Sequence, residues 1–255
     1  MRYPLYIISK GRYQYRHTAK YLDKINIPYS IVIEPQEYEL YAEHIPQSKI
    51  LVLPFSNLGQ GSIPARNWVW QHSLDAGAKK HWILDDNIRA FYTYGDNERI
   101  YAEAGWRGFS DIEDFCDGYQ NIALGGMQYS MFAPSREKHP AILFNTRVYS
   151  CILIDNAIPY RWRGRYNEDT DLSLRALKDG WCTALFYRYL AAKISTMQYK
   201  GGNTDELYKD DGRYQMARSL QLQHPDVTKI TYKWGRYQHS VDYKPFKNNK
   251  LVPVR

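Results

Sequence analysis

The chain has 255 residues, with 34 lysines and arginines against 27 acidic residues, and its net charge is +7. This length suits one domain spanning residues 1–255, because no linker, repeat or low-complexity tract divides the chain. The three cysteines lack metal-ligand spacing, which argues against a structural zinc site, and no apolar run reaches the ~20 residues that span a bilayer. We therefore expect a soluble, cytoplasmic protein that binds no membrane, and the sequence implies no protein partner.

Aromatic residues are interleaved with basic ones, and the chain contains 24 tyrosines and 7 tryptophans. Residues 161–166 and 233–237 show the mixture most clearly. Such side chains stack on bases while neutralising phosphates, and they stack equally well on sugars. A third interpretation is that they are amphipathic surface residues over a small core. Composition alone leaves all three open.

The first 53 residues alternate between strands and helices. Apolar runs predict strands over 6–8, 29–33 and 50–53, and amphipathic patterns predict helices over 13–25 and 37–43. This order is typical of a mostly parallel sheet covered by helices. The loop after the first strand contains Ser9, Lys10 and Arg12 around Gly11, which suits a nucleotide or diphosphate, although its spacing matches no known phosphate-binding fingerprint.

A helix over 62–76 and a buried strand over 81–84 come next. Arg66 and Asn67 lie in the first turn of the helix, outside its apolar face, and are expected to point toward the carboxyl edge of the sheet. The strand ends in Asp85, Asp86 and Asn87. Adjacent carboxylates at such an edge hold a divalent cation against a phosphate, while the alternative is a solvated acidic turn.

The middle of the chain gives weaker signals. Residues 88–110 are expected to form an irregular, aromatic loop, and residues 111–124 a helix that Gly125 and Gly126 end. Strands are predicted over 127–132, 146–154 and 182–187. A helix over 208–223 and a basic aromatic strand or tail over 230–239 close the chain.

A second acidic cluster contains Glu168, Asp169 and Asp171 and precedes an apolar helical pattern. Its acids are explained structurally if Asp169 caps the helix and Asp171 interacts with the positive end of the helix dipole. A carboxylate here is also suited to take a proton from an acceptor hydroxyl. Further on, Lys200 and the two glycines after it form a turn that either neutralises phosphates or is an ordinary loop.

These motifs, taken in order, resemble the nucleotide-binding half of GT-A glycosyltransferases. Four blocks, over residues 7–12, 61–67, 82–87 and 167–172, resemble the TET-associated glycosyltransferase family, and the resemblance covers roughly residues 5 to 205. It implies an α/β, GT-A-like single domain with a mostly parallel central sheet flanked by helices and a smaller acceptor-side sheet. Residues 1–90 would bind a nucleotide sugar, and residues 110–255 the acceptor.

The resemblance also implies an activity. That family occurs largely in bacteriophages and is implicated in adding sugars to hydroxymethylated pyrimidines in DNA, so the protein would act in the cytoplasm of a bacterial host. The expected reaction moves glucose or another hexose from a nucleotide diphosphate sugar, most simply UDP-linked, to the hydroxymethyl group of a 5-hydroxymethylpyrimidine such as 5-hydroxymethylcytosine. Mn²⁺ or Mg²⁺ would assist. The rivals are a GT-A enzyme acting on protein, polysaccharide or lipid, and an idle DNA- or nucleotide-binding module.

The resemblance assigns roles to the matching residues. The expected base is Asp169, with Glu168 second, and the expected metal ligands are Asp86 and Asn87. Many GT-A motifs have aspartate where this chain has Asn87, which is a weaker ligand, so Asp86 carries more of the coordination or the metal binds only with the donor. Donor binding is expected from Ser9, Lys10, Arg12, Arg66, Asn67, Asp85 and Lys200.

Overall fold

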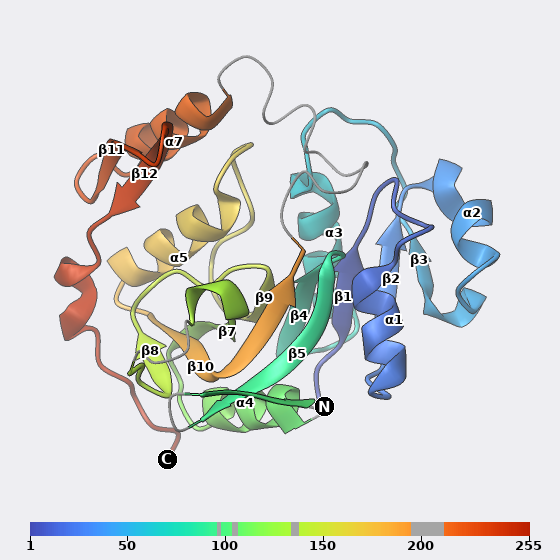
Figure 1. Ribbon diagram of the computed structural model, residues 1–255, viewed down its shortest axis with the longest axis horizontal. Coiled ribbons are helices and arrows are strands. Elements are labelled where there is room, and N and C mark those ends of the chain that lie inside the picture. The colour runs from blue at the N-terminus through green and yellow to red at the C-terminus, as the bar shows by residue number, and fades with distance from the viewer. Residues whose placement is uncertain (96–97, 104–106, 134–137, 195–211) are drawn as a thin grey trace.

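The computed structural model describes residues 1–95, 98–103, 107–133, 138–194 and 212–255. Its centre is one ten-stranded sheet in the order β3-β2-β1-β4-β9-β7-β10-β5-β6, with β8 paired to β10. Helices cover the sheet (Figure 1). The α/β class expected from the sequence is confirmed.

The N-terminal part alternates strands and helices as predicted, and its strands pair in parallel. The elements are β1 (Leu5–Ile8), α1 (His17–Lys24), β2 (Ser30–Ile33), α2 (Tyr38–Ala42), β3 (Ile50–Val52), α3 (Ile63–Asp75) and β4 (Lys80–Asp85). Short 3-10 helices cover Pro35–Glu37 and Gln47–Lys49 here, and Ser130–Phe132 and Lys244–Asn248 later in the chain.

The second part of the sheet is mixed, so the expectation of a mostly parallel sheet holds only for the first part. Strand β9 lies antiparallel between β4 and β7, and β5 and β8 both run antiparallel to β10. The elements are β5 (Ile88–Gly95), β6 (Glu98–Glu103), α4 (Arg107–Asp117), β7 (Ile122–Tyr129), β8 (Ile142–Phe144), β9 (Cys151–Asp155), α5 (Glu168–Lys178), β10 (Cys182–Lys193) and α7 (Gly212–Gln223).

Two local predictions in this part are wrong. Residues 88–110 contain the paired strands β5 and β6, because β5 gains its partner from β10, about 100 residues later in the chain. Gly125 and Gly126 lie inside the buried strand β7 and do not end a helix. A Cβ on Gly126 would lie 2.2 Å from the carbonyl oxygen of Cys151, so glycine is needed there for close packing of β7 on β9.

A two-stranded sheet, β11 (Thr228–Lys233) with β12 (Arg236–Val241), stands apart from the main sheet and packs on α7. It confirms that a second, smaller sheet is present, where the sequence predicted one strand or tail. Among the described residues, no helix combines the length and apolar character that crossing a bilayer requires.

The direction of the strands gathers polar residues at one edge. Strand β7 runs parallel to β10, and both β4 and β7 run opposite to β9, so β1, β4, β7 and β10 all end on the same side of the sheet. Ser9 follows β1, Asp85 ends β4, Tyr129 ends β7 and Lys193 ends β10. Residues that are far apart in the sequence therefore meet at this carboxyl edge.

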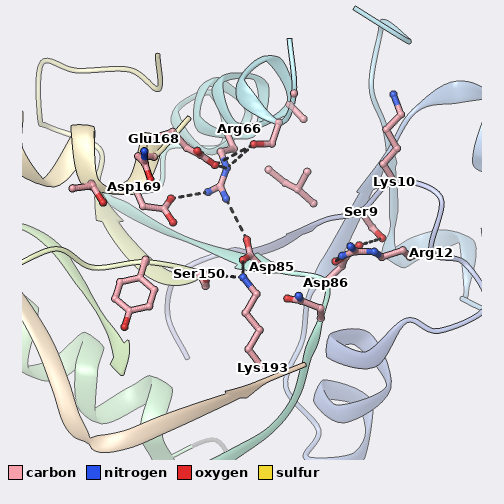
Figure 2. Close-up of a pocket in the computed structure, with 18 of the residues that line it drawn as sticks. Ser9, Lys10, Arg12, Arg66, Asp85, Asp86, Ser150, Glu168, Asp169 and Lys193 are labelled. Atoms are coloured by element: carbon pink, nitrogen blue, oxygen red, sulfur yellow. Dashed lines mark hydrogen bonds and ion pairs between the residues drawn. The ribbon is translucent and has the colours of Figure 1, made fainter. Parts of the chain in front are cut away.

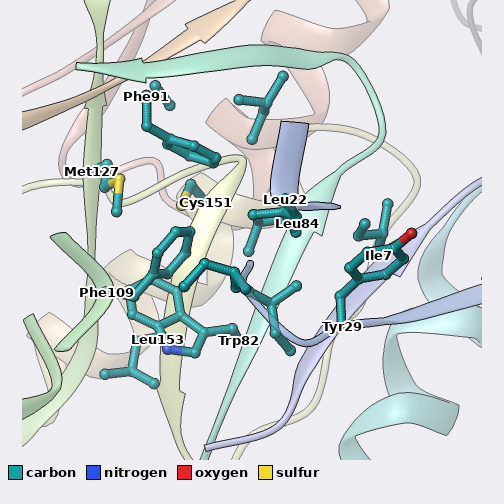
Figure 3. Packing of buried hydrophobic residues seen from close by; sticks show 14 of the residues in the cluster. Ile7, Leu22, Tyr29, Trp82, Leu84, Phe91, Phe109, Met127, Cys151 and Leu153 are labelled. Atoms are coloured by element: carbon teal, nitrogen blue, oxygen red, sulfur yellow. The ribbon is translucent and has the colours of Figure 1, made fainter. Parts of the chain in front are cut away.

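The core beneath this edge contains a group of aromatic rings among aliphatic side chains (Figure 3). Trp82 and Phe91 each contact Phe109 edge-to-face, with ring centroids 5.1 and 5.2 Å apart. The indole N–H of Trp82 donates to Glu113 at 3.0 Å, which satisfies a polar group that burial would otherwise leave unpaired. The core fixes β4 and β5, and with them the turn between these strands that carries the acidic motif.

Candidate active site

A cavity of about 470 Å³ lies at the carboxyl edge of the sheet. Its walls come from the loop after β1, the start of α3, the end of β4, the start of α5 and the end of β10 (Figure 2). The volume falls within the range of pockets that enclose small-molecule ligands. The cavity is therefore the strongest candidate for the active site among the described residues.

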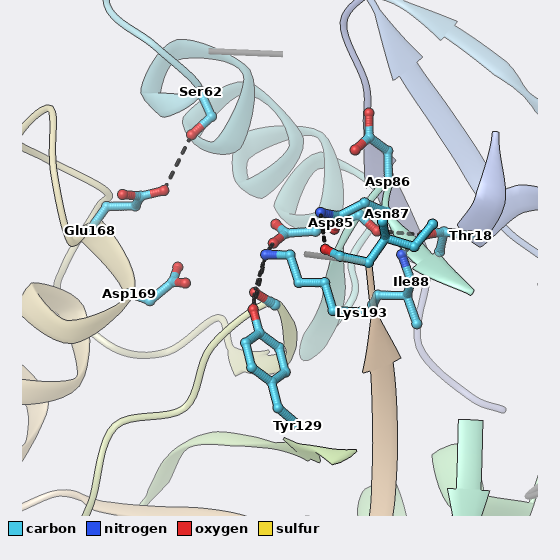
Figure 4. A network of polar contacts seen from close by, with 12 residues as sticks. Thr18, Ser62, Asp85, Asp86, Asn87, Ile88, Tyr129, Glu168, Asp169 and Lys193 are labelled. Atoms are coloured by element: carbon cyan, nitrogen blue, oxygen red, sulfur yellow. Dashed lines mark hydrogen bonds and ion pairs between the residues drawn. The ribbon is translucent and has the colours of Figure 1, made fainter. Parts of the chain in front are cut away.

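The acidic turn at the end of β4 is held by helix α1. The hydroxyl of Thr18 donates to the carbonyl oxygen of Asp85 at 2.6 Å and accepts the backbone N–H of Ile88 at 2.9 Å (Figure 4). These two bonds fix the backbone on both sides of Asp86 and Asn87. The turn is thus an ordered part of the cavity wall.

Asp85 is held between two cations. One carboxylate oxygen lies 3.2 Å from Nη2 of Arg66 and the other 2.6 Å from Nζ of Lys193 (Figure 2). Burial alone would raise its pKa, but the charges of Lys193 and Arg66 lower the pKa of Asp85 to about 2. Asp85 is therefore ionised across the physiological range.

Lys193, Tyr129 and Ser150 are site residues that the sequence did not indicate. Nζ of Lys193 lies 2.9 Å from the Tyr129 hydroxyl and 3.1 Å from Oγ of Ser150, and these two hydroxyls also hydrogen-bond each other. The one sequence signal was a lysine closing a long apolar and aromatic run. Neighbouring carboxylate and phenol groups raise the pKa of Lys193, which outweighs the lowering effect of burial.

Asp86 faces the loop after β1. It forms an ion pair with Arg12 and accepts a hydrogen bond from the Ser9 hydroxyl at 2.8 Å. Ser9 also shares a 2.7 Å hydrogen bond with Tyr41, so the loop is joined to α2. Burial raises the pKa of Asp86, although Arg12 and Ser9 oppose that shift.

Lys10 lies at the outer part of the cavity wall. Its ammonium group contacts Glu34 at 2.9 Å and Asn57 at 3.1 Å. Ser9, Lys10 and Arg12, which the sequence grouped as phosphate-binding candidates, therefore all line the cavity. Their role in donor binding stays a prediction.

The fit of a divalent cation depends on the acidic turn. Within the described ranges, no group of three acidic, histidine or cysteine side chains is placed to hold a metal. The carboxylate oxygens of Asp85 and Asp86 already contact Arg66, Lys193, Arg12 and Ser9. The carbonyl oxygen of the Asn87 side chain, however, is buried and has no hydrogen-bond partner. The described residues alone supply an incomplete ligand set, which phosphate oxygens of a bound ligand could complete.

Arg66 connects the two acidic clusters. Its guanidinium contacts Asp85 at 3.2 Å, Glu168 at 3.6 Å and Asp169 at 3.7 Å. The side chain is 6% exposed, and the aromatic ring of Trp162 lies 4.7 Å from it. The predicted donor and base regions therefore form one continuous charged group.

Asp169, the predicted base, has a raised pKa. Burial raises its pKa to about 7, an effect that Glu168 and Asp85 reinforce and Arg66 and Lys193 oppose. Nη1 of Arg66 and Oδ1 of Asp169 are both buried and form no hydrogen bond, although they face each other at 3.7 Å as an ion pair. Buried polar atoms that line a cavity and form no hydrogen bond are suited to bind a polar ligand.

The lining as a whole is balanced in charge. It carries five acidic side chains, Glu34, Asp85, Asp86, Glu168 and Asp169, and five basic ones, Lys10, Arg12, Arg66, Arg147 and Lys193. A nucleotide diphosphate, if bound here, would add net negative charge to this cavity. A divalent cation bound with the diphosphate would offset that charge.

One predicted donor residue is placed differently. Asn67 does not line the cavity, because its amide donates to the carbonyl oxygen and accepts the N–H of Trp162, both at 2.9 Å. It holds the loop before α5, so its predicted contact with the donor is not supported. Lys200 lies outside the described residues.

Asp171 in the second acidic cluster is buried and structural. It contacts Arg163 and Arg175, each at 2.9 Å, and Nε2 of His224 at 2.9 Å. The three partners come from the preceding loop, from α5 itself and from the residue that follows α7. Asp171 therefore fixes α5, which presents Glu168 and Asp169 to the cavity.

Fold and site together define an α/β protein with a charged, ligand-sized cavity at the carboxyl edge of its sheet. The profile of the TET-Associated Glycosyltransferase family matches residues 3–202. The chain belongs to this family of glycosyltransferases, as the sequence resemblance indicated. The matched region contains both acidic clusters, Arg66 and Lys193.

Two further comparisons add little. No curated protein matches the chain. Among solved structures, mannose-6-phosphate isomerase from Helicobacter pylori aligns over 99% of this chain and 94% of its own, with 11% identity and a TM-score of 0.32. A similarity this low carries no argument about function.

Proposed function

We propose that the protein transfers a hexose, such as glucose, from a nucleotide diphosphate sugar to the hydroxymethyl group of a 5-hydroxymethylpyrimidine in DNA. Membership of the TET-Associated Glycosyltransferase family supports sugar transfer and points to DNA modification. The observation that carries the site assignment is Arg66, which lies between Asp85 and Asp169. We propose that the nucleotide of the donor is UDP.

The donor would occupy the side of the cavity formed by β1, α3 and β4. Lys10, Arg12 and Arg66 supply positive charge there, and Asp85 offers a carboxylate for the ribose hydroxyls. Asn87 and Asp86 would hold Mn²⁺ or Mg²⁺ together with the diphosphate. The cation would offset the negative charge on the leaving diphosphate.

The acceptor side would be formed by the start of α5. In the transfer step, the acceptor oxygen bonds to the anomeric carbon while the bond from that carbon to the diphosphate oxygen breaks, and the diphosphate leaves with the electron pair. Asp169 takes the proton of the acceptor hydroxyl. A base at this position favours inversion at the anomeric carbon. Arg66 keeps Asp169 near the acceptor and partly ionised.

The direct test is incubation of the purified chain with hydroxymethylated DNA, Mn²⁺ and a panel of nucleotide sugars, followed by mass analysis of the nucleosides. The expected result is a hexose mass added to the hydroxymethylpyrimidine, with unmodified DNA as the control. Donor hydrolysis without transfer would mean that another acceptor class is used. If neither product forms, and Asp169→Asn matches wild type in every assay, the proposal fails.

Metal participation has a separate readout. Titration calorimetry with Mn²⁺ alone is expected to show weak or undetectable binding, because Asp85 and Asp86 are engaged by cations. With UDP present, Mn²⁺ binding is expected to appear, and Asn87→Ala should weaken it. Equal Mn²⁺ affinity with and without UDP would contradict a site that the donor completes.

A further inference from the structure

The β11–β12 hairpin has an unusual tip. Residues 232–237, Tyr-Lys-Trp-Gly-Arg-Tyr, are all exposed, and Trp234 is 81% exposed. The hairpin residues 228–241 contain no acidic residue. This segment also lies beyond residues 3–202, which the family profile matches.

The turn at the tip does not follow ordinary turn chemistry. Trp234 and Gly235 are the two loop residues, with φ values of 52° and 70°. Two-residue hairpin turns with both φ values positive favour Asn-Gly, and a bulky residue in the left-handed region is strained. Trp234 is therefore at a position that backbone energetics disfavour, and its exposure shows that it gains no burial in return.

The charges of the hairpin are also unfavourable for the isolated protein. Lys233 and Arg236 are directly opposite each other across the two strands, and like charges at such a pair destabilise a hairpin. Lys229 lies on the same face as Lys233, because every second residue of a strand points to the same side and these two are four residues apart. A polyanion bound to this face would attract these cations and so offset their mutual repulsion.

The aromatic face of the hairpin packs on α7, a helix that also reaches the cavity. Tyr237 pairs with Tyr232 at 5.0 Å between ring centroids and with Tyr214 of α7 at 5.2 Å. Met216 of the same helix lines the cavity. Figure 1 shows α7 lying alongside both strands.

The middle of the hairpin has a second connection to the cavity. Arg147, which lines the cavity, contacts Nε2 of His239 in β12 at 3.5 Å. The hairpin contains six residue pairs, so its tip is about 20 Å from its base. That length corresponds to about six base pairs of DNA.

We propose that the β11–β12 hairpin binds the acceptor DNA outside the active-site cavity, with Lys233 and Arg236 on the phosphates and Trp234 stacked on a base. Aromatic rings that alternate with cations are suited to bind single-stranded or locally opened nucleic acid. The hairpin would hold the strand while the acceptor base enters the cavity. The inference rests on the proposed function for its acceptor, but its test measures binding and needs no turnover.

The central experiment uses two variants that improve the hairpin as a fold element. Trp234→Asn installs a residue favoured at this turn position, and Lys233→Thr with Arg236→Thr removes the like-charge pair. Both are expected to keep or raise the melting temperature. Binding of fluorescently labelled 24-nucleotide DNA is then measured by anisotropy across a salt series, with Leu222→Ala, an exposed α7 variant, as control.

The two variants should differ in their salt dependence. Trp234→Asn is expected to weaken binding about tenfold with an unchanged salt slope, because stacking does not depend on phosphate charge. The double variant is expected to reduce the slope by about 2, one for each lost phosphate contact. A trinucleotide acceptor, too short to reach the tip, should bind all forms equally.

The outcomes separate this inference from the proposed function. If both variants bind the 24-nucleotide DNA within twofold of wild type, the hairpin inference is overturned, whether or not sugar is transferred. If wild type transfers sugar to no DNA but the variants lose binding as expected, the hairpin is a DNA-binding element and the proposed acceptor chemistry fails.

Discussion

Nζ of Lys193 lies 2.6 Å from Oδ2 of Asp85, although 108 residues separate them in the sequence. Lys193 ends β10 and Asp85 ends β4, so the contact exists only because both strands end at the same edge. The ion pair decides the state of the acidic turn. It keeps Asp85 ionised and occupies a carboxylate oxygen that would otherwise be open to a metal.

Replacing Lys193 should therefore change the binding of metal and donor in opposite directions. Lys193→Met keeps most of the side-chain length and removes the charge. Without nucleotide, Mn²⁺ affinity should rise, because one carboxylate oxygen of Asp85, next to the proposed ligands Asp86 and Asn87, is released while Arg66 keeps the other. UDP affinity without metal should fall about tenfold or more, because a cavity cation is lost. Calorimetry measures both. Lys178→Met, which breaks an exposed pair with Asp226, should change neither affinity; parallel changes in both affinities would contradict the role of Lys193.

Asp169→Asn removes the proposed base and keeps the shape of the side chain. Transfer to the acceptor should fall about 10²–10⁴-fold, while the Kd for UDP should change little. Single-turnover kinetics and calorimetry separate the two quantities. Glu168→Gln is the matched comparison, because Glu168 shares the contact with Arg66 and should lose less activity. If Glu168→Gln has the larger effect on transfer, the two roles are reversed.

The pH profile follows from the raised pKa of Asp169. The base acts when ionised, and its pKa is about 7, so kcat at saturating donor should rise with pH between about 6 and 8 and then level off. Arg66 lowers this pKa. Arg66→Gln should therefore move the rising limb to higher pH in addition to lowering the rate. If the kcat of Asp169→Asn still rises over the same pH range, the titrating group is a residue other than Asp169.

Asn67 is expected to affect stability, in contrast to its predicted role in donor binding. Asn67→Ala removes both hydrogen bonds to the backbone of Trp162 and should lower the free energy of unfolding by about 1–3 kcal/mol. Denaturant unfolding measures this change. Gln71→Ala, on the same helix with an exposed hydrogen bond to Asp75, should change stability by less than about 0.5 kcal/mol. A stable Asn67→Ala variant that loses UDP binding would support the predicted role of Asn67 in binding the donor.

Gly126 tests the packing of β7 against β9. Gly126→Ala would place Cβ 2.2 Å from the Cys151 carbonyl oxygen, so the strands must move apart at a cost of about 1–3 kcal/mol or more. Gly118→Ala is the control, since a Cβ at this position would lie 3.3 Å from its nearest neighbour, the carbonyl oxygen of Phe115. The melting temperature should fall clearly more for Gly126→Ala. Equal shifts would show that β7 tolerates the added methyl group.

The sequence by itself determined the parts of this protein that depend on local pattern. Apolar runs bounded by turn residues identified β1 to β4, and the helix with Arg66 in its first turn was found from its apolar spacing. The two acidic clusters and the family also followed from contiguous residues. These features need no information about which strands pair, and the comparisons confirm the family.

Only the tertiary structure decided what depends on long-range pairing. The antiparallel insertion of β9 between β4 and β7, the strand β5 in a region without clear alternation, and the buried Gly125 and Gly126 all depend on partners far along the chain. Lys193 lines the cavity for the same reason. Asn67 does not line it, because both polar groups of its side chain form hydrogen bonds with the backbone of Trp162, 95 residues later in the chain. A side chain's chemistry is visible in the sequence, whereas its partner is set by the register of the sheet.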